Sequence, residues 1–171
     1  MALAGEKCSL PTEDKTTLFT ALHIGASSVS MMIAERTKDG NFLPIDFLEQ
    51  PAPLAHDVFG GNVISNATTE RIVSIIRGYQ QNLAELGLDP YSFTRAVATN
   101  VLHEATNHEA VLNRIRVACR VPVSMIDDGE MTRLIYLKTR RRIQHLPAMT
   151  QRTALVVHVG PGNTRALLFQ E

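Results

Sequence analysis

The sequence predicts an α/β fold built on a mixed sheet, and three observations support this prediction. Three apolar runs near the start of the chain are separated by turn residues, as in an antiparallel meander. The rest of the chain alternates between helical periodicity and short apolar runs, which is typical of strands linked by crossover helices. A composition of 44% hydrophobic and 20% charged residues supports a packed core and excludes disordered and low-complexity classes. The 171 residues suggest one domain, or one domain plus a fragment.

The chain is expected to open with three strands. Apolar residues alternate with other residues in three early runs, as they do in half-buried strands. We predict these strands over 17–24, 29–34 and 42–48. Asp39 and Gly40 lie between the second and third runs and form a strong turn signal. Pro51 closes the meander, and the pair Gly60 and Gly61 indicates a loop after it.

A helix over 66–86 is the clearest in the sequence. Its apolar residues recur at helical spacing: Ile72, Val73, Ile75, Ile76, Tyr79, Leu83 and Leu86. Asn66 or Thr68 is expected to cap its start, and Gly87 stands where a C′ glycine belongs. The short apolar run 93–98 that follows predicts a buried strand.

The rest of the chain continues the alternation of helices and strands. Asn107 opens a helical pattern that extends to Arg120. Asp127 or Asp128 opens another, which ends near Arg142. We predict the strands of this part over 121–126, 153–159 and 164–169.

A meander followed by alternating helices and strands is the order expected of a ribonuclease-H-like lobe, with a mixed sheet and helices on both faces. Each later strand must cross back over a helix to pair in parallel. We divide the chain into a flexible tail (1–16), the lobe (17–152) and a hairpin (153–171). The hairpin is expected to begin a second lobe or to complete a dimer, because exposed strand edges seek partners. A short echo of 23–25 in 158–160, both His-aliphatic-Gly, favours a second unit.

Charge and cysteine content exclude several classes of function. The 17 basic and 17 acidic residues give no formal net charge, so the sequence lacks the long-range electrostatics of a nucleic-acid or anionic-membrane binder. Cys8 and Cys119 lie in unlike contexts and predict no disulfide, and Cys119 is expected to be a small buried hydrophobe. Because no stretch suits a secretion signal or a membrane span, we expect a cytoplasmic protein.

Four segments of the sequence resemble motifs that occur, in this order, in one protein family. Residues 23–28 (HIGASS) resemble D-I-G-S-N-S, and residues 97–107 (VATNVLHEATN) resemble V-A-T-S-A-x-R-E-A-x-N. Residues 126–136 (IDDGEMTRLIY) are similar to I-S-G-x-E-E-A-R-L-I-Y, and residues 155–165 (LVVHVGPGNTR) to L-V-I-D-I-G-G-G-S-T-E. The chain thereby resembles the exopolyphosphatase and guanosine pentaphosphate phosphohydrolase (Ppx/GppA) family of the actin-like phosphotransferase superfamily. The resemblance implies a module of two α/β lobes with the site between them.

The resemblance assigns phosphate binding to two turns and one helical residue. Backbone N–H groups and serine hydroxyls in such turns surround phosphate oxygens. Pro161 stands at a family glycine position and weakens the second turn, because proline lacks an N–H and fixes φ. His103 replaces a family arginine and loses its bidentate binding unless protonated. The candidate phosphate-binding residues are Gly25, Ala26, Ser27, Ser28, His103, Gly160, Gly162, Asn163 and Thr164.

Positions at which the family carries acidic side chains hold other residues in this chain. His23 and His158 precede the two turns, and imidazole is a poor Mg²⁺ ligand, so the magnesium that the resemblance implies loses its anchors. Met131 stands at the position that resembles the family's general base, and a thioether cannot accept a proton. Glu130 is adjacent but points about 100° away on the helix, so it is a weak substitute. No catalytic residue of the family is intact.

Two features leave alternatives open. His23, His103 and His158 would form a zinc-type site of three imidazoles if the cleft brought them together, although three such replacements need no common purpose. The basic run 138–142 would bind a polyanion, but cations in the last turn of a helix also complement its dipole.

The sequence therefore predicts a Ppx/GppA-related N-terminal domain with impaired catalysis, which binds phosphate or polyphosphate or acts as a regulatory module. The alternative is an active phosphoanhydride hydrolase, an exopolyphosphatase or guanosine pentaphosphate phosphatase, that a second lobe completes. The expected partners are polyphosphate or guanosine polyphosphate, and a second copy bound through the C-terminal hairpin. Nucleic acid and membranes are not expected partners.

Overall fold

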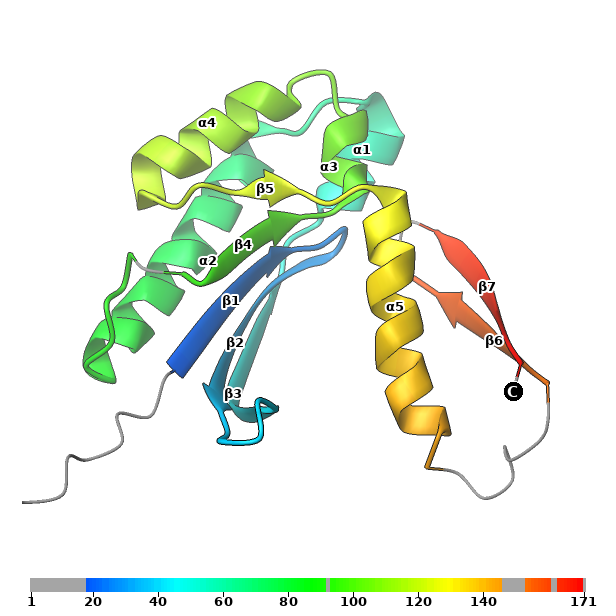
Figure 1. Ribbon diagram of the computed structural model, residues 1–171. Helices are drawn as coiled ribbons and strands as arrows, with labels where there is room; N and C mark the ends of the chain where they lie inside the picture. The colour runs from blue at the N-terminus through cyan, green and yellow to red at the C-terminus, as the bar shows by residue number, and fades with distance from the viewer. Residues whose placement is uncertain (1–17, 92, 146–152, 161–162, 171) are drawn as a thin grey trace, which may run out of the picture.

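The computed structural model describes residues 18–91, 93–145, 153–160 and 163–170, and Figure 1 shows the order of its elements. The predicted tail, 1–16, lies outside the described residues. The strands are β1 (Leu18–Ile24), β2 (Ser28–Arg36), β3 (Phe42–Pro51), β4 (Arg95–Ala98), β5 (Ser124–Met125), β6 (Ala154–Val159) and β7 (Thr164–Phe169). The helices are α1 (Leu54–Gly61), α2 (Asn66–Glu85), α3 (Asn100–Glu104), α4 (His108–Cys119) and α5 (Asp128–Ile143). None of the described helices is long and apolar enough to span a membrane.

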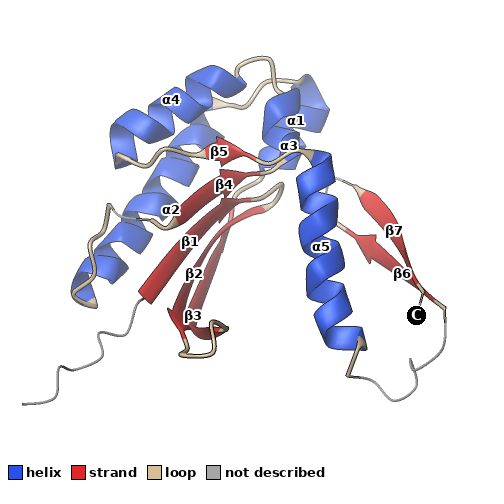
Figure 2. Cartoon of the chain, viewed as in Figure 1, coloured by secondary structure: helices blue, strands red, loops and turns tan. Residues whose placement is uncertain are grey.

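The first five strands form one mixed sheet in the order β3-β2-β1-β4-β5. β1, β2 and β3 pair as an antiparallel meander, while β4 pairs in parallel with both β1 and β5. β6 and β7 form a separate antiparallel hairpin, which Figure 2 shows beside α5. The predicted fold class, a meander extended by parallel strands, is confirmed.

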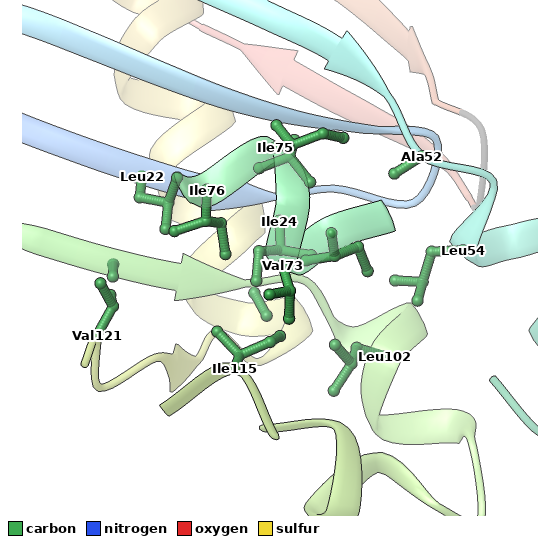
Figure 3. Close-up of a cluster of buried hydrophobic side chains, with 14 of the residues drawn as sticks. Leu22, Ile24, Ala52, Leu54, Val73, Ile75, Ile76, Leu102, Ile115 and Val121 are labelled. Atoms are coloured by element: carbon green, nitrogen blue, oxygen red, sulfur yellow. The ribbon is translucent and has the colours of Figure 1, made fainter. Parts of the chain in front are cut away.

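The apolar core lies on one face of this sheet, under α2 and α4. Leu22 pairs with Met31 across β1 and β2, and all of their side-chain surface is buried. Two residues further along β1, Ile24 pairs with Val29 and is buried as well (Figure 3). Tyr79 of α2 packs over this pair and donates its hydroxyl hydrogen to the Val29 carbonyl at 2.8 Å. The core therefore fixes the end of β1, where the first candidate turn begins.

The opposite face of the sheet is packed much less closely. α5 lies on that side of the strands in Figure 1, yet none of its residues is buried. Several large apolar side chains of the meander remain exposed: Met32, Phe42, Leu43, Ile45 and Phe47. Helices stand on both sides of the sheet as expected, but only α1 to α4 contribute to the main core.

Two short helices were not predicted. α1 occupies the segment that Gly60 and Gly61 indicated as a loop, and α3 follows directly after β4. α1 forms because Leu54 and Val58 lie one turn apart and are both buried, which outweighs the low helix propensity of glycine in its last turn. α3 packs against α1 and completes the cover at the end of β1.

The C-terminal end of α2 agrees with the prediction, whereas its N-cap is a different residue. Ser65, and neither Asn66 nor Thr68, is the N-cap, because its side chain accepts the Thr68 N–H at 3.1 Å. Gly87 has a φ of 73° and occupies the C′ position, as predicted.

The second half of the sheet is shorter than predicted. β5 contains two residues, whereas the sequence suggested a strand over 121–126. Pro122 lacks an N–H, so pairing with β4 begins only after it. Asn107 precedes α4 as expected, but its side chain binds the backbone of Ile64 and does not cap the helix.

The β6–β7 hairpin has two unlike faces. Leu167 and Phe169 are buried on the side of α5, where the Phe169 ring stacks on Tyr136 with the centroids 4.8 Å apart. The outer face, defined as Leu155, Val157, Val159, Ala166 and Leu168, is aliphatic and exposed. A hairpin with such a face is rarely stable alone and gains from a partner.

We expect two copies of the chain to associate through this outer face, because it carries no charge that would repel its own copy. Light scattering should give about twice the chain mass of 18.9 kDa at high concentration. The double variant Val157→Asp with Leu168→Asp should remain at the monomer mass. Val117→Asp, an equally exposed position on α4, serves as the control and should behave like the wild type. A monomer at every concentration of the wild type would contradict this expectation.

Candidate functional site

A pocket of about 460 Å³ lies where the end of β1, the start of α3, one side of α5 and the hairpin meet. Residues 25–28 form one wall, and residues 99–101 lie beside them at the start of α3. α5 contributes residues spaced by three or four, which is the spacing of one helix face. The hairpin adds His158, Gly160, Asn163 and Arg165. With Glu49 of β3, five segments that are distant in sequence therefore share one cavity.

Two segments of the pocket lining carry the same backbone hydrogen bond. The Gly25 N–H donates to the Ser28 carbonyl at 2.8 Å, and the Gly160 N–H donates to the Asn163 carbonyl at 2.8 Å. A Cβ on Gly25 would lie 3.1 Å from the Ser28 carbonyl oxygen and 3.2 Å from His23 Cε1, so a side chain at position 25 would crowd the turn. The echo between 23–25 and 158–160 thus coincides with a hydrogen bond from each glycine to the third residue after it.

His23 is a largely buried histidine at the edge of the pocket. Burial lowers its pKa below the usual value of 6.5, and the negative charge of Glu49 opposes this shift in part. His23 Nε2 is buried and has no hydrogen-bond partner among the described residues, and Thr99 Oγ1 is in the same situation. Because both residues line the pocket, a ligand or water in the pocket would satisfy these two atoms.

Glu49 brings a carboxylate to the first turn. It lies on β3 in register with Ser30, and Ser30 lies in register with His23 on β1, so all three occupy one face of the sheet. Glu49 Oε1 accepts a hydrogen bond from Ser28 Oγ at 2.6 Å. A proton acceptor therefore touches the turn, from a strand that none of the four family-like segments includes.

Arg165 ties the hairpin to the start of α5. Its Nη2 donates to Asp128 Oδ1 at 2.6 Å, its Nε donates to Thr132 Oγ1 at 3.0 Å, and its Nη1 donates to Asn163 Oδ1. The Arg165 side chain is only 12% exposed, so this ion pair is partly shielded from solvent. Arg165 closes one side of the pocket and has each of its three nitrogens engaged.

α5 gives the pocket an apolar wall. Asp127 caps the helix by accepting the Glu130 N–H at 2.7 Å, as the sequence predicted. Met131 lies in the pocket, so the position that resembles the family's general base does face the cavity but carries a thioether. Leu134 and Ile135 follow on the same face, and Lys138 is the cation at its far end.

Glu130 does not compensate for Met131. Both of its carboxylate oxygens accept hydrogen bonds from Arg133, at 2.7 and 2.8 Å, and it does not line the pocket. The Arg133 hydrogen bond lowers the pKa of Glu130, which makes it a weaker base. Glu130 is thus paired with Arg133 on its own helix and lies outside the pocket lining.

The structure separates several candidates from the pocket. His103 does not line it, because its ring packs edge-to-face on His108 with the centroids 4.7 Å apart. Thr164 is not part of the lining either, and Gly162 and Pro161 lie outside the described residues. Of the nine candidate phosphate-binding residues, six line the pocket: Gly25, Ala26, Ser27, Ser28, Gly160 and Asn163.

The pocket suits a metal ion poorly. Among the described residues, no group of three or more His, Cys, Asp or Glu side chains could hold one. His103 is absent from the pocket lining, so the three imidazoles of the zinc-type alternative do not share this cavity. The carboxylates of Glu49 and Asp128 do line it, and each accepts a hydrogen bond, from Ser28 and Arg165 respectively.

Sequence reasoning missed Glu49 and Asp128 as pocket residues. Glu49 lies outside the four family-like segments, and only the strand register places it beside the turn. Asp128 is within one of them, where the family has glycine, and it was considered only as a helix cap. One signal in the sequence could have indicated Asp128. It introduces a negative charge at a family glycine position, and Arg165 introduces a positive charge at a family glutamate position, so the two residues could form an ion pair.

Cys119 is buried, as predicted. Burial raises the pKa of its thiol, and its Sγ contacts the Val73 carbonyl at 3.7 Å. It therefore behaves as a small apolar residue of the core.

No protein-family model matches this chain, whereas several solved structures share its fold. The Ppx/GppA family member from Aquifex aeolicus has a TM-score of 0.70 and 22% identity over 90% of this chain and 47% of that protein. An exopolyphosphatase from Cytophaga hutchinsonii has a TM-score of 0.74 and 16% identity over the same two shares. An exopolyphosphatase-like protein has a TM-score of 0.69 and 19% identity over 91% and 46%.

The chain is thus a structural match to one half of Ppx/GppA proteins and spans about half of their length. At these identities the likeness shows the fold. It agrees with the resemblance carried by the four sequence segments.

Acid should destabilise the protein through His23. Burial lowers the pKa of His23 in the folded state, so the folded protein binds a proton at this site less readily than the unfolded chain, in which the pKa is about 6.5. The neutral imidazole therefore contributes fully to stability above pH 6.5, and this contribution is lost as the pH falls below that value. The free energy of unfolding, measured by urea titration, should fall between about pH 7.5 and about pH 5. His23→Gln should flatten this dependence. His145→Gln, at an exposed histidine outside the pocket, should leave it unchanged, and an identical pH slope for all three proteins would contradict the assignment.

Proposed function

We propose that this chain is a phosphate-binding lobe that holds a phosphoryl ligand but does not hydrolyse it by the water-activating route of the Ppx/GppA family. The observation that carries the proposal is that the turn of residues 25–28 and Met131 line the same pocket. The residues suited to hold phosphate are present. The position that resembles the family's general base carries a thioether, which cannot accept a proton from water.

Binding is supported by the chemistry of the first turn. The Gly25 N–H is engaged by the Ser28 carbonyl, and the backbone N–H groups of Ala26 and Ser27 and the hydroxyl of Ser27 can donate to phosphate oxygens. Glycine at position 25 allows the close backbone geometry that such a turn requires. Asn163 offers an amide from the second turn, and Lys138 adds a positive charge opposite. These donors converge on a cavity large enough for a phosphoryl group and a further moiety.

Loss of turnover is supported by three positions. His23 and His158 stand where the resemblance implies acidic residues, and both lie at the pocket. Met131 stands at the position of the general base. A general base contributes a factor of roughly 10² to 10⁴ in rate, so its loss reduces hydrolysis to a very low level.

Calorimetric titration and a phosphate-release assay together test this proposal. The full chain should bind inorganic phosphate and release no phosphate from tripolyphosphate in the presence of Mg²⁺. Ser27→Ala should weaken binding by about tenfold, because it removes one donor to a charged ligand. Ser74→Ala, on the exposed side of α2, is the matched control.

Replacement of Met131 tests the cause of inactivity. Met131→Glu should raise phosphate release at least about tenfold over the wild type, because it returns a proton acceptor to the pocket. Met32→Glu, at an exposed methionine outside the pocket, should not. Substantial release by the unmodified chain would refute the proposed inactivity.

One observation favours a second candidate, an active phosphoanhydride hydrolase. Glu49 touches Ser28 at 2.6 Å and would accept the proton of an attacking water in place of residue 131. In this case the wild type hydrolyses tripolyphosphate, and Glu49→Gln reduces the rate by at least about a hundredfold. Glu109→Gln, an exposed glutamate on α4, provides the control.

A further inference from the structure

The charged side chains of the pocket cancel one another. Glu49, Asp128, Lys138 and Arg165 line it, two negative and two positive. Asp128 and Arg165 form an ion pair at 2.6 Å, and all three guanidinium nitrogens of Arg165 already donate hydrogen bonds. The side chains that line the pocket thus contribute no net formal charge, because Glu49 and Lys138 are also opposite in sign.

This balance disfavours a ligand with many negative charges. Glu49 lies directly on the phosphate-binding turn, through its hydrogen bond with Ser28. Each additional phosphate in the pocket would be repelled by this carboxylate, and the positive side chains of the lining do not outnumber the negative ones. Burial keeps His23 neutral at pH 7, so it contributes no further positive charge.

One wall of the pocket is apolar. Val101 of α3 and Met131, Leu134 and Ile135 of α5 line the cavity beside the polar turns. Leu134 is 41% exposed, so its apolar surface is open to whatever enters the cavity. An inorganic phosphate chain gains nothing from covering such a surface, whereas the organic part of a ligand gains hydrophobic free energy.

Two buried polar atoms of the lining are open to a ligand. Among the described residues, His23 Nε2 and Thr99 Oγ1 have no hydrogen-bond partner, and both belong to the pocket lining. Hydroxyl groups or ring heteroatoms of an organic ligand would satisfy them without adding charge. The cavity of about 460 Å³ also exceeds the space that a single phosphate fills.

We infer that the pocket selects a phosphate monoester with a mainly apolar organic body over an inorganic polyphosphate chain. The phosphate lies at the turn of residues 25–28, and the organic body covers Met131, Leu134 and Ile135. This inference rests on the proposed function, since it names the class of ligand for the same site.

Calorimetric titration of the full chain compares four probes: adenosine 5′-monophosphate, phenyl phosphate, inorganic phosphate and tripolyphosphate. At least one of the two monoesters should bind more tightly than both inorganic probes, by about fivefold or more. Tripolyphosphate as the tightest probe would overturn the inference and leave the proposed function intact. Binding of none of the four would overturn the proposed function as well.

A matched pair of variants on α5 tests the apolar wall. Leu134→Lys should weaken the monoesters and strengthen tripolyphosphate, about tenfold in the ratio of the two affinities, because it replaces apolar surface with a cation. Leu137→Lys adds the same charge at a leucine that is 40% exposed on the same helix but outside the pocket. It should leave the ratio at the wild-type value. Equal effects of the two variants, with folding verified by circular dichroism, would overturn the inference.

Discussion

The pocket depends on the ion pair between Arg165 and Asp128. The hairpin is a separate two-stranded sheet, and this pair, with the stacking of Phe169 on Tyr136, fixes its position on α5. Without these contacts the second turn has no defined place opposite the first. Both members of the ion pair depart from the family-like segments, one from glycine and one from glutamate. The two residues are complementary in charge, so together they hold the hairpin against the start of α5.

The fold was largely predictable from local patterns. The alternation in 18–24 and the helical stripe in α2 predicted their elements because burial on one face imposes a period on the sequence. α1 and α3 were missed because each is about two turns long or shorter and buries only two residues, so no period develops. β5 was overestimated because an apolar run shows burial without showing where hydrogen bonding to a neighbouring strand begins.

The site was predictable only where it coincides with motifs. The turn of residues 25–28, His23, His158 and Met131 were named from the sequence, and all of them line the pocket. Glu49 was not, because its closeness to Ser28 arises from pairing of β2 with β3 and leaves no trace in spacing. His103 was named from the sequence but is absent from this lining; its ring contacts His108, which the motif position does not reveal.

The two strands of the hairpin present unlike faces. His158 and Arg165 form a directly opposed pair that lines the cavity, while Val157 and Ala166, the next pair along, lie on the other face. Because successive residues of a strand alternate in direction, a slip of either strand by one residue would turn its polar group, the imidazole or the guanidinium, outward and bring an aliphatic group inward. The cavity and the aliphatic surface behind it therefore share one register, and a change that shifts it alters both at once.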